Sequence, residues 1–173
     1  MSVSAAIRLE ITAVEELLAA AIPTVSASDE GSSRLTHKAF NISGLRLNGS
    51  TTAKVDAVAF GQLVTDGADT IDLTAVQTAL DAAADMTGKK VVAAIFRCPS
   101  TNAAAINIAP GASNGYALFG AGNDFSVAKG MVVAFAFDGV ASQLPTVSGT
   151  EKNIDVSGTA TDVLKYLFLL GTP

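Results

Sequence analysis

The sequence predicts an all-β fold, an antiparallel β-sandwich of jelly-roll-like or immunoglobulin-like type, with an N-terminal α-helical arm. Two observations predict the sandwich. Short apolar runs of strand length alternate with Gly, Pro, Asn and Ser over most of the chain. The 173 residues also suffice for one domain with a sizeable core plus an appendage. A different apolar spacing at the start of the chain predicts the arm.

The first 23 residues form this expected helical arm. Within residues 3–22, Ile7, Ile11, Val14 and Leu18 are spaced by four, three and four positions, which places them on one stripe of a helix. Ala and Leu favour helix, and Pro23 ends it. The helix could pack on its own domain or dock on a neighbouring subunit or its copies. We take the stripe as a partner-contact face.

Residues 24–36 are expected to be a flexible linker, because their Ser, Asp, Glu and Gly content leaves little apolar surface to bury. A β-sandwich domain over residues 37–173 follows. Its pattern begins at His37–Ser43, and the next strands are expected at 55–64 and 70–73. Residues 75–85 are rich in Ala and read as either a short helix or a helical loop.

The second half of the domain contains the most apolar strands. Lys89–Arg97 lacks strict alternation, so we expect a central strand covered on both faces. Met131–Phe137 places Phe on one face and small residues on the other, which indicates a closely approaching second layer. Asp162–Leu170 is expected to be a central strand, with helix as the competing interpretation. Further strands are expected at 104–109, 116–119, 125–127, 144–147 and 153–156.

Composition narrows the function classes. Charged residues make up 16% of the chain, against about 25% in typical domains, which suits a subunit that buries much of its surface against neighbours. The net charge of −5 argues against a nucleic-acid partner. The chain contains no run of about 20 apolar residues, so no membrane-spanning helix is expected. The single Cys98 cannot form an internal disulfide.

Residues that could carry chemistry do not form a recognisable motif. Asp66, Asp69 and Asp72 lack the spacing of a calcium loop, and one His with one Cys cannot build a zinc site. The glycine-rich stretches 111–115 and 120–123 lack the G-K-[ST] of a phosphate loop and are expected to be turns. A nucleophilic pair would need His37 and Cys98 to meet. We therefore expect no enzyme activity, cofactor or metal.

A carbohydrate-binding module is an alternative within the same fold class. Such modules stack exposed aromatic rings on sugars. This chain has no Trp and only two Tyr, Tyr116 and Tyr166. Binding to a glycan array, lost when either Tyr is replaced, would support this alternative.

Short phrases at turns and strand ends follow one another in a characteristic order from about His37 to Gly171. They are Phe40-Asn41-Ile42-Ser43-Gly44, Leu47-Asn48-Gly49-Ser50-Thr51-Thr52, Ile71-Asp72-Leu73-Thr74, Met86-Thr87-Gly88-Lys89-Lys90-Val91, then after Asn102 Ile106-Asn107-Ile108-Ala109-Pro110-Gly111-Ala112-Ser113-Asn114-Gly115-Tyr116 and Phe119-Gly120, and finally Ile154-Asp155-Val156-Ser157-Gly158-Thr159 and Leu170-Gly171. In this order the phrases resemble small virion proteins of tailed bacteriophages. They identify a scaffold, and no active-site residue accompanies them. The resemblance implies a β-sandwich structural subunit of the particle.

The resemblance favours a capsid decoration, or cement, protein that stabilises the shell through multivalent protein–protein contacts. The expected partners are its own copies, in a homotrimer, and the major capsid protein or other virion proteins. The expected location is the virion, assembled in the host cytoplasm. A tail, collar or fibre-base component is the alternative within the particle.

Overall fold

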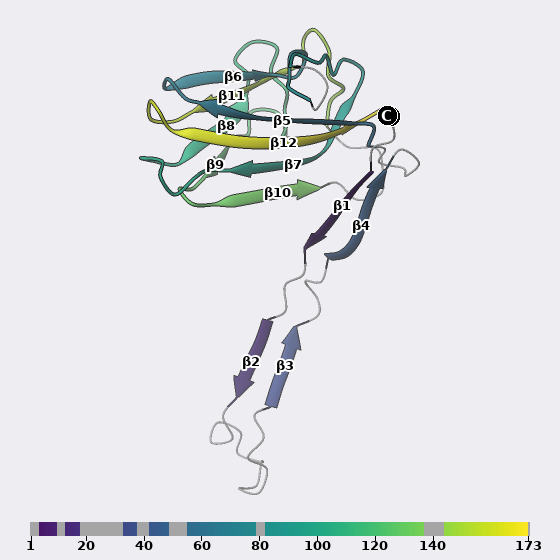
Figure 1. The fold of residues 1–173 in the computed structure, drawn as a ribbon, viewed down its shortest axis with the longest axis vertical. Helices are drawn as coiled ribbons and strands as arrows, with labels where there is room; N and C mark the ends of the chain where they lie inside the picture. Colours follow the sequence, from purple (N-terminus) through teal and green to yellow (C-terminus); the bar gives the residue numbers. More distant parts are fainter. Residues whose placement is uncertain are drawn as a thin grey trace, which may run out of the picture. The chain divides into compact units, whose positions relative to one another are not determined.

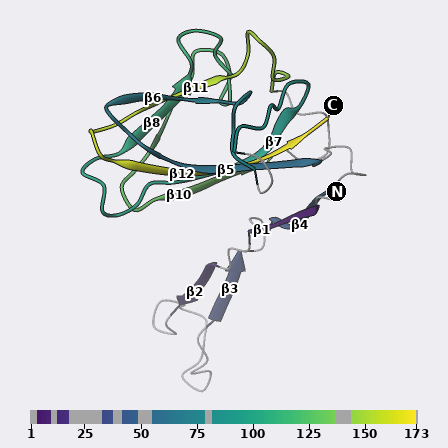
Figure 2. The same cartoon turned by 45° about the horizontal axis from the view of Figure 1, so that its top comes forward.

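A computed structural model describes residues 55–78, 82–136 and 144–172, together with the backbone of four strands nearer the N-terminus. The described part is all-β and contains two four-stranded antiparallel sheets that form a β-sandwich (Figures 1 and 2). The strand order is β10-β7-β12-β5 in the first sheet and β6-β11-β8-β9 in the second. The strands are β5 (Ala57–Val64), β6 (Ala68–Asp72), β7 (Lys90–Arg97), β8 (Ile106–Pro110), β9 (Phe125–Val127), β10 (Val132–Ala136), β11 (Asn153–Ser157) and β12 (Val163–Gly171).

The eight strands pair in a nested pattern. The outermost two in sequence, β5 and β12, pair antiparallel, and so do β6 with β11, β7 with β10, and β8 with β9. Two further contacts, β12 with β7 and β11 with β8, join these pairs into the two sheets. The chain therefore follows the path of one long hairpin, β5–β8 returning as β9–β12, that is wrapped into two layers.

The core lies between the two sheets because strands of both alternate inward-facing apolar side chains. In the first sheet Phe96 and Phe168 are fully buried, and their rings meet edge to face with centroids 5.6 Å apart. Opposite them, Ile106, Ile108 and Ile154 of the second sheet are also fully buried. Along β8 and β11 the fully buried residues lie two positions apart, as strand geometry requires.

The strand expectations hold for most of the sandwich. β7 is central in its sheet, as its apolar run predicted, and the segment ending at Leu170 is a central strand, which excludes the competing helix. Two expected strands are wrong. Residues 116–119 form a loop that ends in a turn, although Tyr116 and Leu118 are buried, and residues 144–147 make no strand. Apolar residues in both segments fill the core from loops. The described parts of 75–85 contain turns and a Val76–Ala84 bridge, and no helix.

Toward the N-terminus, the structure places strands where a helix was expected. β1 (Ser4–Leu9) shares a two-stranded sheet with β4 (Ile42–Asn48), and β2 (Ala13–Leu17) pairs antiparallel with β3 (Ser33–His37). This corrects the helix prediction at β1 and β2, because strand pairing overrides the helix propensity of Ala and Leu there. The rest of residues 3–22 lies outside the described residues.

The flexible linker expected over residues 24–36 is corrected at its C-terminal end. Residues 33–36 belong to β3, and residues 24–32 lie outside the described residues. By contact density the chain divides into two compact units, residues 6–45 and residues 1–5 with 46–173. The sandwich belongs to the second unit.

Tyr116 ties the two layers together through its hydroxyl. The side chain is fully buried, the hydroxyl accepts a hydrogen bond from the backbone N–H of Val91 (3.0 Å), and it donates one to the carbonyl of Pro145 (2.9 Å). Burial raises the pKa of Tyr116 to about 12, so the phenol stays neutral at physiological pH. A loop residue thereby satisfies a backbone donor of β7 and an acceptor of a second loop.

Replacing Tyr116 with Phe should lower the free energy of unfolding by about 1–3 kcal/mol, because a buried N–H and a part-buried carbonyl lose their hydrogen bonds to the Tyr116 hydroxyl. Urea denaturation measures this change. Tyr166→Phe is the matched control, since that hydroxyl makes no hydrogen bond within the described residues and the ring is only half-buried. Equal losses in both variants would contradict the role assigned to the Tyr116 hydroxyl.

Candidate functional surface

The outward face of the first sheet is apolar, although its residues do not belong to the core between the two sheets. Strand register identifies the residues that share each row across β10, β7, β12 and β5. One row contains Ala134, Ile95, Leu167 and Phe60. The next contains Ala136, Ala93, Leu169 and Val58. Each of these residues alternates along its strand with residues of the inter-sheet core, so all eight point away from it.

This outward face is apolar over both rows and is partly open to solvent. Phe60 at one edge is 37% exposed, and Val132 at the other edge is 60% exposed. Ala134 and Ala136 are exposed, whereas Ala93 and Leu169 are buried. An antiparallel sheet usually places polar residues on the face that does not meet the core. An apolar outward face is typical of a contact surface.

The second sheet shows the usual arrangement, which makes the contrast internal to the molecule. Its outward positions carry Thr70, Asp155, Ser157 and Asn107. Thr70 donates a hydrogen bond to Asp155 (2.8 Å) and Asn107 donates one to Asp124 (3.0 Å). The outward face of the second sheet is therefore hydrophilic at these positions. Of the two four-stranded sheets, the first presents the apolar rows.

One end of the apolar face is cationic. The row beside Ala134 contains Val132, Arg97, Lys165 and Gln62, and both charged residues are exposed. Acidic side chains are instead on the outward face of the second sheet, at Asp155 and Asp124. The first sheet thus offers an apolar patch with a positive border.

A shallow pocket lies beside the β10 edge, on its inward side. It has a volume of about 480 Å³ and is lined by apolar residues of a loop, of β10 and of a second loop. Three rings near it, Phe119, Phe125 and Phe135, pack with centroid distances of 5.0 to 5.3 Å. Among the described residues, its lining is apolar and contains no titratable side chain, so it suits an apolar group. The lining residues are Ala117, Leu118, Phe119, Gly120, Ala121, Phe135, Leu144 and Pro145.

The structure describes two of the four residues that were expected to form the contact face of the arm. Ile7 lies in β1 and Val14 lies in β2, so these two do not share a helical stripe. Ile11 and Leu18 lie outside the described residues. The contact role expected of all four stays a prediction. A second layer was expected close to the small residues of β10, but Ala134 and Ala136 are exposed, and the second sheet packs on the other side of the strand, against Val133 and Phe135.

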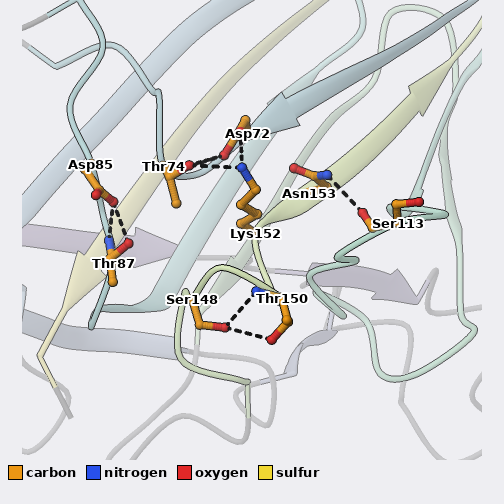
Figure 3. Close-up of polar contacts among 9 residues, drawn as sticks. All are labelled: Asp72, Thr74, Asp85, Thr87, Ser113, Ser148, Thr150, Lys152 and Asn153. Atoms are coloured by element: carbon orange, nitrogen blue, oxygen red, sulfur yellow. Dashed lines mark hydrogen bonds and ion pairs between the residues drawn. The ribbon is translucent and has the colours of Figure 1, made fainter.

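The aspartates weighed as metal ligands serve the backbone. Asp69 accepts a hydrogen bond from the backbone N–H of Asp66 (2.8 Å), and Asp72 accepts from the N–H and hydroxyl of Thr74 and forms an ion pair with Lys152 (2.6 Å; Figure 3). Asp85 caps Thr87 in the same way. Within the described residues, no group of three or more His, Cys, Asp or Glu converges as a metal site would require.

The other polar contacts of this region also hold loops. Asn153 donates a hydrogen bond to the carbonyl of Ser113 (2.9 Å), and the backbone N–H of Thr150 donates one to the hydroxyl of Ser148 (Figure 3). A side chain at Gly115 would place its Cβ 2.3 Å from the carbonyl oxygen of Gly111, so a close backbone approach explains this glycine-rich stretch. Gly120 and Gly122 have positive φ values of 93° and 72°, as turns require.

The remaining candidates are positioned for packing. Cys98 is buried, and its sulfur receives a hydrogen bond from Asn102 (3.2 Å). His37 is the last residue of β3, where the structure describes the backbone alone. Tyr116 is fully buried and cannot stack on a sugar ring as it stands, and Tyr166 is half-buried. None of these residues gives the described surface an evident reactive group.

Comparisons with known proteins add no relative. The chain matches no family model, no curated protein and no solved structure. In the part of the chain that the structure describes, no helix has the length and apolar character needed to cross a bilayer. Functional inference therefore rests on the sequence phrases and on the surface just described.

The Asp72–Lys152 ion pair gives the fold a pH-dependent contribution. Burial raises the pKa of Asp72, but hydrogen bonds from Lys152 and Thr74 outweigh it and hold the pKa below the ordinary value of 3.8. A carboxyl group whose pKa is lower in the folded state stabilises the fold above its unfolded pKa. That stabilisation is lost as the pH falls through the folded-state pKa.

The free energy of unfolding should therefore decrease as the pH drops below about 4. Replacing Lys152 with Gln should make this decrease smaller. Urea denaturation at a series of pH values from 7 to 3 measures the effect. Lys129→Gln is the control, because Lys129 is exposed and makes no ion pair with a described residue. If Lys152→Gln and Lys129→Gln give the same pH profile, the ion pair does not stabilise the fold.

Proposed function

We propose that this chain is a structural protein of a tailed-phage virion, a capsid decoration protein that binds neighbouring proteins through the outward face of its first sheet. The observation that carries the proposal is the pair of apolar rows on that face. A face of this kind is costly to leave in water, and buried contact with another protein relieves the cost. The sequence phrases shared with small phage virion proteins supply the biological setting.

The topology supports the jelly-roll-like form of the sandwich over the immunoglobulin-like form. In a jelly roll, eight strands form two sheets through two Greek keys, and the nested pairing of β5–β8 with β9–β12 has this form. Jelly rolls serve in viral capsids, and also in lectins. Because one fold hosts many functions, the apolar face of the first sheet carries the proposal and the fold supports it.

Decoration would act by mass action. A protein that binds only the assembled lattice stabilises that assembly by the free energy of binding, and many weak contacts around a shell act together. The charge distribution suits such a partner, since the border formed by Arg97 and Lys165 favours an acidic rim around an apolar patch. The site would lie in the virion, on particles assembled in the host cytoplasm. The homotrimer expected from the sequence stays a prediction.

Copy number in purified particles tests the location. Quantitative mass spectrometry of virions that contain this chain should give hundreds of copies per particle for a shell protein. Tens of copies or fewer would instead support a tail, collar or fibre-base component. Absence of the chain from intact particles would refute the virion role.

The N-terminal segment provides a second test of the proposal. A chain lacking residues 1–23 should keep a folded sandwich, because β5–β12 form both four-stranded sheets without it. It should lose occupancy on particles at least ten-fold if the segment is a contact arm. The measurement is rebinding of purified chain to particles stripped of it, with circular dichroism as the control for folding. Unchanged occupancy would refute the arm.

A further inference from the structure

We propose that two copies of this chain pair edge to edge through β10, antiparallel about a two-fold axis at Ala134, and so join their first sheets into one. The inference rests on the proposed function only in treating the outward face as a contact surface. It names the occupant of the neighbouring edge as a second copy of the chain. It can be tested on purified protein without particles.

The edge of β10 lacks the devices that protect the other described edges. β5 receives a backbone contact, since the N–H of Phe60 donates to the carbonyl of Gln77 (2.9 Å). β6 carries Asp69 and Asp72, and β9 is only three residues long. β10 has five residues without a charge or proline. An uncharged apolar edge of this kind is a template for strand pairing.

The outer edge of β10 has no strand partner among the described residues. β10 is the first strand in its sheet and pairs only with β7 within that sheet. Beyond this ladder, no backbone hydrogen bond of Val132–Ala136 is found among the described residues. Strand addition at such an edge supplies its binding energy from main-chain hydrogen bonds.

The sequence of β10 complements itself about its centre. With Ala134 on the axis, Val132 of one copy lies opposite Ala136 of the other, so a larger side chain meets a smaller one on the outward face. On the inward face Val133 lies opposite Phe135, which is a favourable β-branched–aromatic pair. The same two pairs recur on both sides of the axis. An isologous two-fold contact requires this self-complementarity.

Charge and continuity also favour a second copy. The row of Ala134, Ile95, Leu167 and Phe60 would continue into the same row of the partner, which doubles the width of the apolar face. Strand spacing and rise place the two Arg97 side chains roughly 20 Å apart in this arrangement. That separation exceeds the Debye length of about 8 Å at physiological salt, so the cations do not oppose pairing.

Sedimentation velocity of the full chain over a range of concentrations tests the pairing. The wild-type chain should sediment with the mass of two 17.5-kDa chains at high concentration. Ala134→Lys should weaken the dissociation constant at least ten-fold, because two like charges would meet at the axis. Ala68→Lys is the matched control, an exposed alanine on the edge strand of the other sheet, and should change nothing.

A monomer at every concentration or a dimer weakened equally by both lysines would overturn the pairing. So would the homotrimer expected from the sequence, with which the two-fold pairing competes. A second variant tests the register directly. Ala134→Cys should form a covalent dimer under mild oxidation, because opposed residues at the axis lie within disulfide distance, whereas Ala68→Cys and the wild-type chain, with its buried Cys98, should not. Failure of Ala134→Cys to cross-link at concentrations where the chain is dimeric would also overturn it. Neither result depends on particle binding.

Discussion

The pairing of β12 with both β5 and β7 is the constraint on which the rest of the sandwich depends. Three inward-facing residues of β12, Leu164, Phe168 and Leu170, are buried in the core. The same strand supplies Leu167 and Leu169 to the outward face. Because both sets are apolar, β12 reads as a nearly continuous hydrophobic run. A strand of that kind stabilises the core and also creates the surface that needs a partner.

Where β12 begins, two buried polar residues fix its position. Asn102 donates a hydrogen bond to the carbonyl of Val163 (2.9 Å) and accepts one from its N–H (2.9 Å). Asp162, also buried, accepts hydrogen bonds from the N–H groups of Ala103 and Ala104. A one-residue slip of β12 would reverse its faces, and it would break these contacts as well. The loop after β7 thus sets the register of the central strand.

Local patterns predicted most of the strands, and the failures have physical causes. β10 and β11 alternate cleanly, so a period of two identified them and their faces. Residues 116–119 are apolar because Tyr116 and Leu118 reach the core from a loop, and composition cannot separate that case from a strand. At β1 and β2, Ala and Leu favoured helix, while pairing with β4 and β3 decided the outcome.

The candidate surface was not foreseeable from single strands. The small residues of β10 were expected to lie under a second layer and are exposed instead, and the row that joins them to Phe60 depends on a register that no single strand contains.

The nested strand order also affects synthesis. Ala59 is paired with Phe168, and at synthesis rates of 5–20 residues per second the ribosome needs roughly 5 to 20 seconds to bridge that gap. During this interval the nascent β5 lacks its partner strand β12, so its apolar residues should stay accessible to chaperones until β12 emerges.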